Sequence, residues 1–258
     1  MGKMTAKTFV EKALDIAKNY KTLYVMGCFG APLVGTQVDR YCKNHSYNKK
    51  SSRTKMIKAA GNQTPPVYGF DCVCLIKGIL WGWSGKADRI YGGAAYATNG
   101  VPDIGANTMI GYCTGVSSKN WADMVPGEAV WCSGHIGIYI GNGLAIECTP
   151  SWKNCVQITA VGNIGSKAGY NTRTWTKHGK LPWVDYSENI DNKTENKKIE
   201  KGSKVRIRSG AKTYTGGNLA SFVYKTTYTV IEVVGSRVVI GLNGVVTAAV
   251  NAKDITLL

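Results

Sequence analysis

Cys72 is the residue whose setting most favours chemistry in this 258-residue chain. It follows Asp71, and the segment DCVCLIKGILW (71–81) predicts a mostly buried helix with Asp71 as its N-cap. The free N–H groups and the dipole at a helix start favour a thiolate, which is the nucleophile that a cysteine hydrolase needs. Cys74 is predicted to face away from Cys72, into the core.

A thiol nucleophile also needs a base, and His135 has the most suitable surroundings of the three histidines. It opens a predicted strand, HIGIYI (135–140), whose isoleucines alternate on the core face while His135 and Gly137 lie on the other face. A three-residue turn at 141–143 would pair position 137 with Glu147. Glu147 would then lie diagonal to His135, fix its tautomer and leave the second ring nitrogen for the thiol. A one-residue shift in register would destroy this arrangement.

Each of these residues also has a structural interpretation. A free cysteine is usually a core residue, a single histidine is usually hydrogen-bonded in the interior, and Glu147 alone would be an exposed strand residue. We interpret His178 as structural and His45 as solvated. The eight cysteines lack zinc-site spacing, so no metal or other cofactor is expected, and they are predicted to be reduced thiols. Pairing of Cys148 with Cys155 in an oxidising medium is left open.

The elements that must position these residues change in character along the chain. A helix is predicted at 6–20 with Thr5 as its cap, and strands are predicted at 129–132, 136–140, 144–148 and 156–160. Helices followed by an antiparallel sheet indicate an α+β fold. Residues 186–199 are a predicted polar linker. Residues 200–258 predict a small all-β barrel, with strands at 204–208, 222–224, 228–234, 237–242, 245–250 and 254–257.

The charge balance restricts the partners. The chain has 32 Lys and Arg against 16 Asp and Glu, a formal charge of +16, which favours nucleic acid, anionic lipid or an anionic wall polymer. No nucleic-acid-binding motif is present, so nucleic acid is not expected. Charged residues throughout 1–25 exclude the apolar core of a signal peptide, and no run is apolar enough for membrane insertion. We therefore expect synthesis in a cytoplasm. The basic segment 36–64 is predicted to be a solvated surface, with contact to phosphate or a wall polymer as the alternative.

Several motifs together resemble those of the NlpC-type, papain-like cysteine peptidases. FDC (70–72) before an apolar helix resembles the Asp-Cys-Ser-Gly nucleophile motif, although Val73 and Cys74 replace Ser-Gly. PGEAVW (126–131) and GHIGIYIGNG (134–143) are similar to the family's strand and histidine segments. The family's third polar residue lies about twelve positions after its histidine, which is Glu147 here. YVMGC (24–28) resembles the family's Tyr-x-Trp-Gly-Gly segment, which places Tyr24 near the active site.

This resemblance covers roughly residues 5–185 and implies a papain-like catalytic domain at 1–185. It implies that Cys72, His135 and Glu147 cleave an amide of bacterial peptidoglycan through an acyl-enzyme, with Tyr24 beside the oxyanion. The implied bond joins D-glutamate to a diamino acid, and an N-acetylmuramoyl-L-alanine amidase with the same triad is the alternative. Residues 200–258 resemble bacterial SH3-like domains that bind a wall polymer.

The combination resembles a phage or prophage endolysin, which is made in the cytoplasm and reaches the wall after the membrane is permeabilised. Two functions of other classes stay open. One is an inactive wall-binding protein, although the presence of Cys72, His135 and Glu147 together argues against it. The other is a nucleic-acid-binding protein driven by charge.

Overall fold

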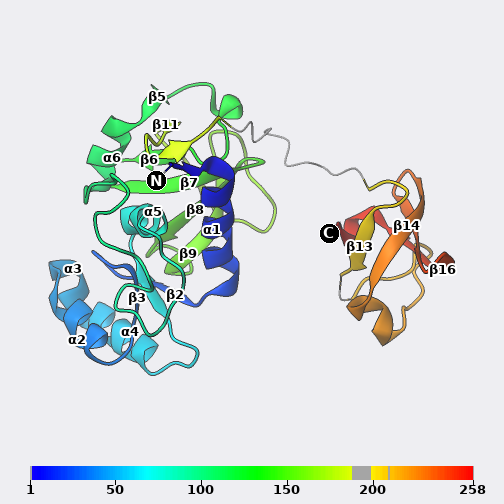
Figure 1. Ribbon diagram of the computed structural model, residues 1–258, viewed down its shortest axis with the longest axis horizontal. Helices are drawn as coiled ribbons and strands as arrows, with labels where there is room; N and C mark the ends of the chain where they lie inside the picture. The colour runs from blue at the N-terminus through cyan, green and yellow to red at the C-terminus, as the bar shows by residue number, and fades with distance from the viewer. Residues whose placement is uncertain (1, 188–198, 209, 258) are drawn as a thin grey trace. The chain divides into compact units, whose positions relative to one another are not determined.

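Contacts between residues divide the chain into two units, Met1–Lys193 and Thr194–Leu258. The computed structural model describes residues 2–187, 199–208 and 210–257 (Figure 1). Most of the predicted linker, 188–198, therefore lies outside the described residues. No helix in the described ranges has both the length and the apolar character needed to cross a bilayer.

The first unit begins with the predicted amphipathic helix, α1 (Ala6–Asn19). Thr5 caps it, because its side-chain oxygen accepts a hydrogen bond from Thr8 N at 3.2 Å, and Phe9 and Ala13 are fully buried. The helix that carries Cys72, α5 (Cys72–Leu80), is buried along its whole length. The remaining helices of this unit are α2 (Thr36–Lys43), α3 (Ser46–Lys49), α4 (Ser51–Gly61), α6 (Ala106–Tyr112) and the 3-10 turn η1 (Trp121–Asp123).

A seven-stranded sheet, ordered β10-β9-β8-β7-β6-β11-β5, forms the other layer. All its pairings are antiparallel except that of β10 with β9. Helices α1 and α5 pack against β7 and β8, and the main core lies between these layers (Figure 1). The first unit is thus α+β, as predicted. Its strands are β5 (Thr114–Ser117), β6 (Ala129–Cys132), β7 (His135–Gly141), β8 (Leu144–Thr149), β9 (Cys155–Val161), β10 (Thr172–Arg173) and β11 (Lys177–Lys180).

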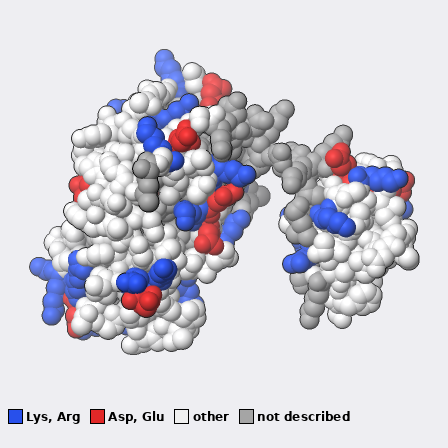
Figure 2. All heavy atoms as spheres, viewed as in Figure 1, with Lys and Arg blue, Asp and Glu red and all other residues white. Residues whose placement is uncertain are grey.

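Two small sheets complete the first unit. One has the order β2-β4-β3, formed by β2 (Thr22–Tyr24), β3 (Phe29–Pro32) and β4 (Tyr68–Phe70). Strand β4 leads directly into α5, so this sheet sets where the helix begins. The other pairs β1 (Met4–Thr5) with β12 (Val184–Asp185). Helices α2, α3 and α4 gather at one end, beside β2 and β3, and Figure 2 shows lysine and arginine side chains over that end.

The turn between β7 and β8 differs from the predicted three-residue turn. Gly141 pairs with Leu144, so the turn has two residues, Asn142 and Gly143, both with positive φ as such tight hairpins require. A β-bulge between Tyr139 and Gly141 supplies the extra residue. Since Ile138 pairs with Ile146, position 137 still faces Glu147. The predicted register is therefore present, although the predicted turn is wrong.

The second unit is an antiparallel sheet of five strands in the order β16-β15-β14-β13-β17, around a core that includes Val205, Tyr228 and Val238. Its strands are β13 (Lys204–Ile207), β14 (Thr227–Val234), β15 (Arg237–Leu242), β16 (Val245–Asn251) and β17 (Ile255–Leu257). A further 3-10 turn, η3, spans Ala252–Asp254. The strand predicted at 222–224 is wrong: Ser221–Lys225 is the 3-10 turn η2. A three-residue apolar run is too short to identify a strand, and Phe222 is 63% exposed.

Candidate active site

Asp71 positions Cys72 by fixing the start of α5. Its Oδ1 accepts the N–H of Cys74 at 2.7 Å, which is the predicted N-cap contact. Its Oδ2 accepts the N–H of Gly27 at 2.7 Å, so the same carboxylate ties the helix start to the loop after β2. Cys72 is 7% exposed at this end of the helix.

The environment of Cys72 opposes the thiolate that a helix start is expected to favour. Burial raises the pKa of its thiol to about 12, and the neighbouring Asp71 carboxylate adds to this effect. The N–H of Ile136 and the first N–H groups of α5 lower the pKa, but they do not outweigh burial. The helix start is therefore not enough to lower the pKa of the thiol, because the sulfur is buried and lies beside a carboxylate. At neutral pH Cys72 is a thiol, and a base has to remove its proton.

His135 and Glu147 meet as the register predicted. His135 Nε2 lies 2.7 Å from Glu147 Oε2, and Glu147 is fully buried. Since Nε2 is engaged, Nδ1 is the nitrogen left for the thiol. Cys72 approaches the start of β7 through the N–H of Ile136. Within the described part of the first unit, no hydrogen bond joins the Cys72 sulfur directly to His135.

Two residues that the sequence analysis missed complete the surroundings of Glu147. Arg173 Nε donates to Oε1 at 2.9 Å and to Oε2 at 2.7 Å, and the Thr159 hydroxyl donates to Oε1 at 2.7 Å. Burial acts to raise the pKa of Glu147, but the hydrogen bonds from His135 and Arg173 outweigh it and lower the pKa. Thr159 could have been found from the pairing of β8 with β9. Arg173 stands on a two-residue strand that leaves no periodic signal.

Trp175 is a third missed residue, and it holds the His135 ring from one side. The two rings are stacked, with centroids 5.5 Å apart and planes 8° from parallel. Gly137 makes the room for this ring. A Cβ at position 137 would lie 3.0 Å from Trp175 Cη2 and 2.9 Å from the carbonyl oxygen of Ile146. The space over Gly137 is therefore filled by the Trp175 ring.

A cavity of about 530 Å³ lies over the helix start and is lined by Cys72, Asp71 and Tyr24. The Tyr24 hydroxyl donates to Met26 Sδ at 3.9 Å. Burial, followed by the nearby Cys72 and Asp71, raises the pKa of Tyr24, so its phenol keeps its proton and stays a donor. The structure thus brings Tyr24 to the same cavity as Cys72.

The other two histidines have different surroundings. His45 is exposed, as predicted, but it also lines this cavity, and its ring covers Gly27 so closely that a Cβ there would lie 2.2 Å from Nε2. His178 is buried, with Nδ1 2.7 Å from Glu128 Oε2 and Nε2 2.9 Å from the carbonyl oxygen of Lys119. These contacts tie β11 to the segment before β6, in line with the structural interpretation of His178.

The eight cysteines are free thiols. Cys148 is fully buried, and its thiol donates to the carbonyl oxygen of Phe70 at 3.2 Å. Across residues 2–187, 199–208 and 210–257, no group of three or more His, Cys, Asp or Glu side chains is arranged to hold a metal ion.

No protein-family model and no curated protein sequence matches the chain. Among solved structures, the chain is similar to the peptidoglycan hydrolase RipB from Mycobacterium tuberculosis. The two are 19% identical, the match covers 70% of this chain and 67% of that chain, and the TM-score is 0.33.

Proposed function

We propose that the first unit hydrolyses an amide bond of bacterial peptidoglycan, with Cys72 as nucleophile and His135 as base. The observation that carries this proposal is the 2.7 Å contact of His135 with the buried Glu147, beside a helix start that presents a cysteine to a cavity. Nucleophilic catalysis by a cysteine requires a histidine whose tautomer is fixed by a third group and whose free nitrogen can reach the thiol. The proposal of peptidoglycan as substrate rests on the motifs at 70–72 and 126–143.

The proposed reaction begins with transfer of the thiol proton from Cys72 Sγ to His135 Nδ1. The thiolate attacks the amide carbonyl, and the oxyanion accepts hydrogen bonds from the Cys72 N–H and the Tyr24 hydroxyl. His135 then gives its proton to the leaving amine as the C–N bond breaks. Water, activated by the same histidine, attacks the thioester and releases the acid and the free thiol.

Glu147 and Arg173 set the state of His135 in this scheme. The carboxylate accepts a hydrogen bond from Nε2–H, so Nδ1 is unprotonated and able to act as a base. Arg173 neutralises the buried carboxylate before the reaction begins. The imidazolium formed during the reaction is then stabilised by Glu147, with Trp175 keeping the ring plane fixed.

The finer assignments belong to the same proposal. We propose that the bond lies between D-glutamate and a diamino acid, with cleavage at the muramoyl–alanine bond as the alternative. We propose that the first unit is papain-like. We propose that the second unit is an SH3-like module that binds an anionic wall polymer, because residues 200–258 contain eight Lys or Arg against three Asp or Glu. The proposed site of action is the wall after the membrane is permeabilised, as for a phage endolysin.

The test is digestion of purified peptidoglycan with the wild type, Cys72→Ala and a matched control, Cys42→Ala, with products read by mass spectrometry. Cys42 is a buried cysteine on α2 outside the cavity. New amines within the stem peptide, absent only with Cys72→Ala, support the endopeptidase. Free lactyl groups with intact stem peptides identify the amidase instead. If the wild type binds several wall types and cuts none, the protein is a wall-binding protein and the catalytic proposal is wrong.

A further inference from the structure

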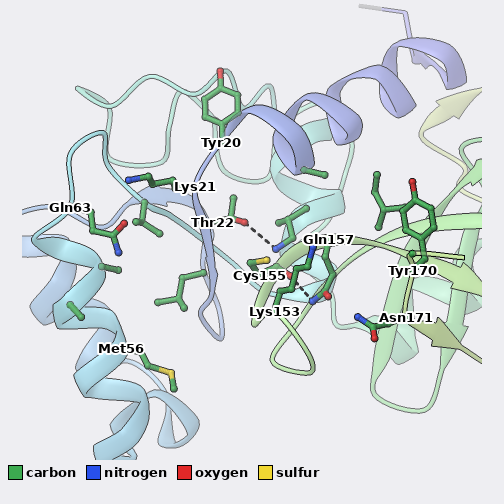
Figure 3. Close-up of a pocket in the computed structure, with 18 residues that line it drawn as sticks. Tyr20, Lys21, Thr22, Met56, Gln63, Lys153, Cys155, Gln157, Tyr170 and Asn171 are labelled. Carbon is green, nitrogen blue, oxygen red and sulfur yellow. Dashed lines mark hydrogen bonds between the residues drawn. The ribbon is translucent and has the colours of Figure 1, made fainter. Parts of the chain in front are cut away.

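A second cavity, of about 660 Å³, lies next to the site just described and has no part in the proposed reaction. It is bounded by the end of α1, the start of β2, helix α4, strand β9 and the loop at 169–171 (Figure 3). Strand β2 lines both cavities: Thr22 and Leu23 line this one, and Tyr24 lines the cavity of Cys72. Its volume is typical of a site for a small ligand or for one unit of a polymer.

The floor of this cavity is apolar and held in place by hydrogen bonds. Leu23, Val67 and Val156 are among the aliphatic residues that line it. The Thr22 hydroxyl accepts the N–H of Val156 at 3.0 Å, which joins β2 to β9 across the floor. The Gln157 side chain is buried, and its amide donates to the carbonyl oxygen of Ser151 at 3.0 Å. The floor is therefore formed without a ligand, which reduces the entropy cost of binding.

The rim is cationic. Lys21 and Lys153 both line the cavity, and among the residues that the structure describes no aspartate or glutamate lines it (Figure 3). In the described part of the chain neither ammonium group forms a salt bridge. Two cations without a carboxylate beside an apolar floor are complementary to an anion carried on a partly apolar body.

The remaining lining residues suit a ring with hydroxyl and amide substituents. The side chain of Tyr170 presents a flat aromatic face with a polar tip, whereas the ring of Tyr20 packs edge to face against Tyr68 and Trp83. Gln63 and Asn171 are exposed amides at the rim, so each offers both donors and an acceptor. Tyr170 is 42% exposed, which leaves its ring available to a ligand.

We propose that this cavity binds one acidic saccharide unit of a cell-wall polymer. The sugar ring lies on the apolar floor beside Tyr170, and its carboxylate or phosphate lies between Lys21 and Lys153. The wall as the source of this saccharide rests on the proposed function. The free carboxylate of a muramic acid unit that carries no stem peptide and the phosphate of a polyol-phosphate chain share this chemistry, and the test separates them. Since β2 joins the two cavities, such a site would hold the polymer close to the bond that is cut.

The experiment is a titration of the full-length chain followed by two-dimensional NMR, with Cys72→Ala as background so that nothing is hydrolysed. Three probes are compared: a disaccharide of N-acetylglucosamine and N-acetylmuramic acid, N-acetylglucosamine 6-phosphate, and the uncharged N,N′-diacetylchitobiose, called chitobiose below. We expect one or both anionic probes to shift the side-chain amide signals of Gln157 and Asn171. Which anionic probe binds more tightly identifies the source. Chitobiose should bind at least about fivefold more weakly, as expected for the loss of a charge contact near the surface.

Charge variants test the same site. The double variant Lys21→Gln, Lys153→Gln should weaken binding of the anionic probe about tenfold at low salt, since each exposed contact contributes up to about fivefold. Its control, Lys7→Gln with Lys18→Gln, removes the same charge from exposed positions of α1 and should leave the affinity unchanged. Equal affinity for chitobiose, no effect of the double variant, or shifts confined to the Cys72 cavity would overturn the proposal.

The outcome is independent of the proposed catalysis. If the probe binds at Gln157 and Asn171 but the wild type cuts no peptidoglycan, only the proposed hydrolase function fails. If the wild type cuts peptidoglycan through Cys72 but no anionic probe binds here, only the saccharide site fails.

Discussion

Glu147 is a buried carboxylate that contacts a histidine, an arginine and a threonine, and this combination decides how His135 behaves. With Arg173 present, the charge of the carboxylate is compensated whether or not His135 carries a proton. Without Arg173, only His135 could compensate the charge of the carboxylate. The carboxylate would then favour the imidazolium form of His135, which cannot act as a base.

Replacing Arg173 with glutamine should therefore lower activity and stability together. We expect kcat/KM to fall about tenfold or more and unfolding to become easier by about 2 kcal/mol, which is below the range for a fully buried pair because Arg173 is partly exposed. The acid side of the pH–rate profile should move to higher pH, and Arg173→Lys should restore part of the activity. An unchanged pH profile with only a loss of stability would show that Arg173 is purely structural.

The pKa of Glu147 also predicts a pH dependence of stability. Because the folded-state pKa is lowered, the carboxylate stabilises the fold above its ordinary pKa, and this contribution is lost as the pH falls through the folded-state value. Urea unfolding of the wild type and Glu147→Gln should show the largest difference in free energy of unfolding near neutral pH. The difference should shrink in acid, and a difference independent of pH would contradict the lowered pKa.

The raised pKa of Cys72 predicts slow alkylation. Since only the thiolate reacts, the rate with iodoacetamide should rise about tenfold for each pH unit through the neutral range, without a plateau. The rate is measured by peptide mapping of the Cys72 peptide, with Cys72→Ala to identify the signal. A plateau that begins below pH 7 would mean that the free protein already holds a thiolate.

At the scale of elements, the β7–β8 hairpin and the start of α5 build most of the candidate site, and both could be predicted. The Asp71 cap follows from residue type and position. The sequence predicts the pairing of 137 with 147 from a three-residue turn, and in the structure a two-residue Asn-Gly turn with a β-bulge gives the same register. The resting state of Cys72 could not be predicted, because burial and the proximity of Asp71 depend on the packed structure. Arg173 could not be predicted either, because β10 reaches Glu147 only through its parallel pairing with β9.

A substitution at Gly137 tests how far the packing around β7 affects stability and activity. Gly137→Ala places a Cβ against the Trp175 ring and the Ile146 carbonyl, so we expect a loss of about 1–3 kcal/mol from overpacking and reduced activity as the ring beside His135 shifts. Gly111→Ala on α6 is the control, because a Cβ there meets nothing within 4 Å and alanine favours a helix. Both are measured by thermal unfolding and peptidoglycan digestion, and equal behaviour would exclude a role for the Trp175 stacking.

At the scale of the whole molecule, the +16 charge and the two units predict how the proposed wall binding responds to salt. Lysis of intact walls should fall as ionic strength rises, because screening weakens attraction to an anionic polymer. A chain that ends at residue 193 should lose more activity on walls than on a soluble muropeptide. Turbidity assays on walls and chromatography of the soluble substrate measure the two, and an equal loss on both would place the second unit in catalysis rather than in binding.

The position of Asp71 carries a further consequence. The carboxylate that fixes the helix start also helps to keep the neighbouring sulfur protonated. Protonated sulfur is a poor target for peroxides, so the free protein should be oxidised slowly at pH 7, which the rate of sulfenic acid formation at Cys72 would measure. The same carboxylate thus has two effects: it orders the start of α5, and it protects the thiol of the free protein from oxidation.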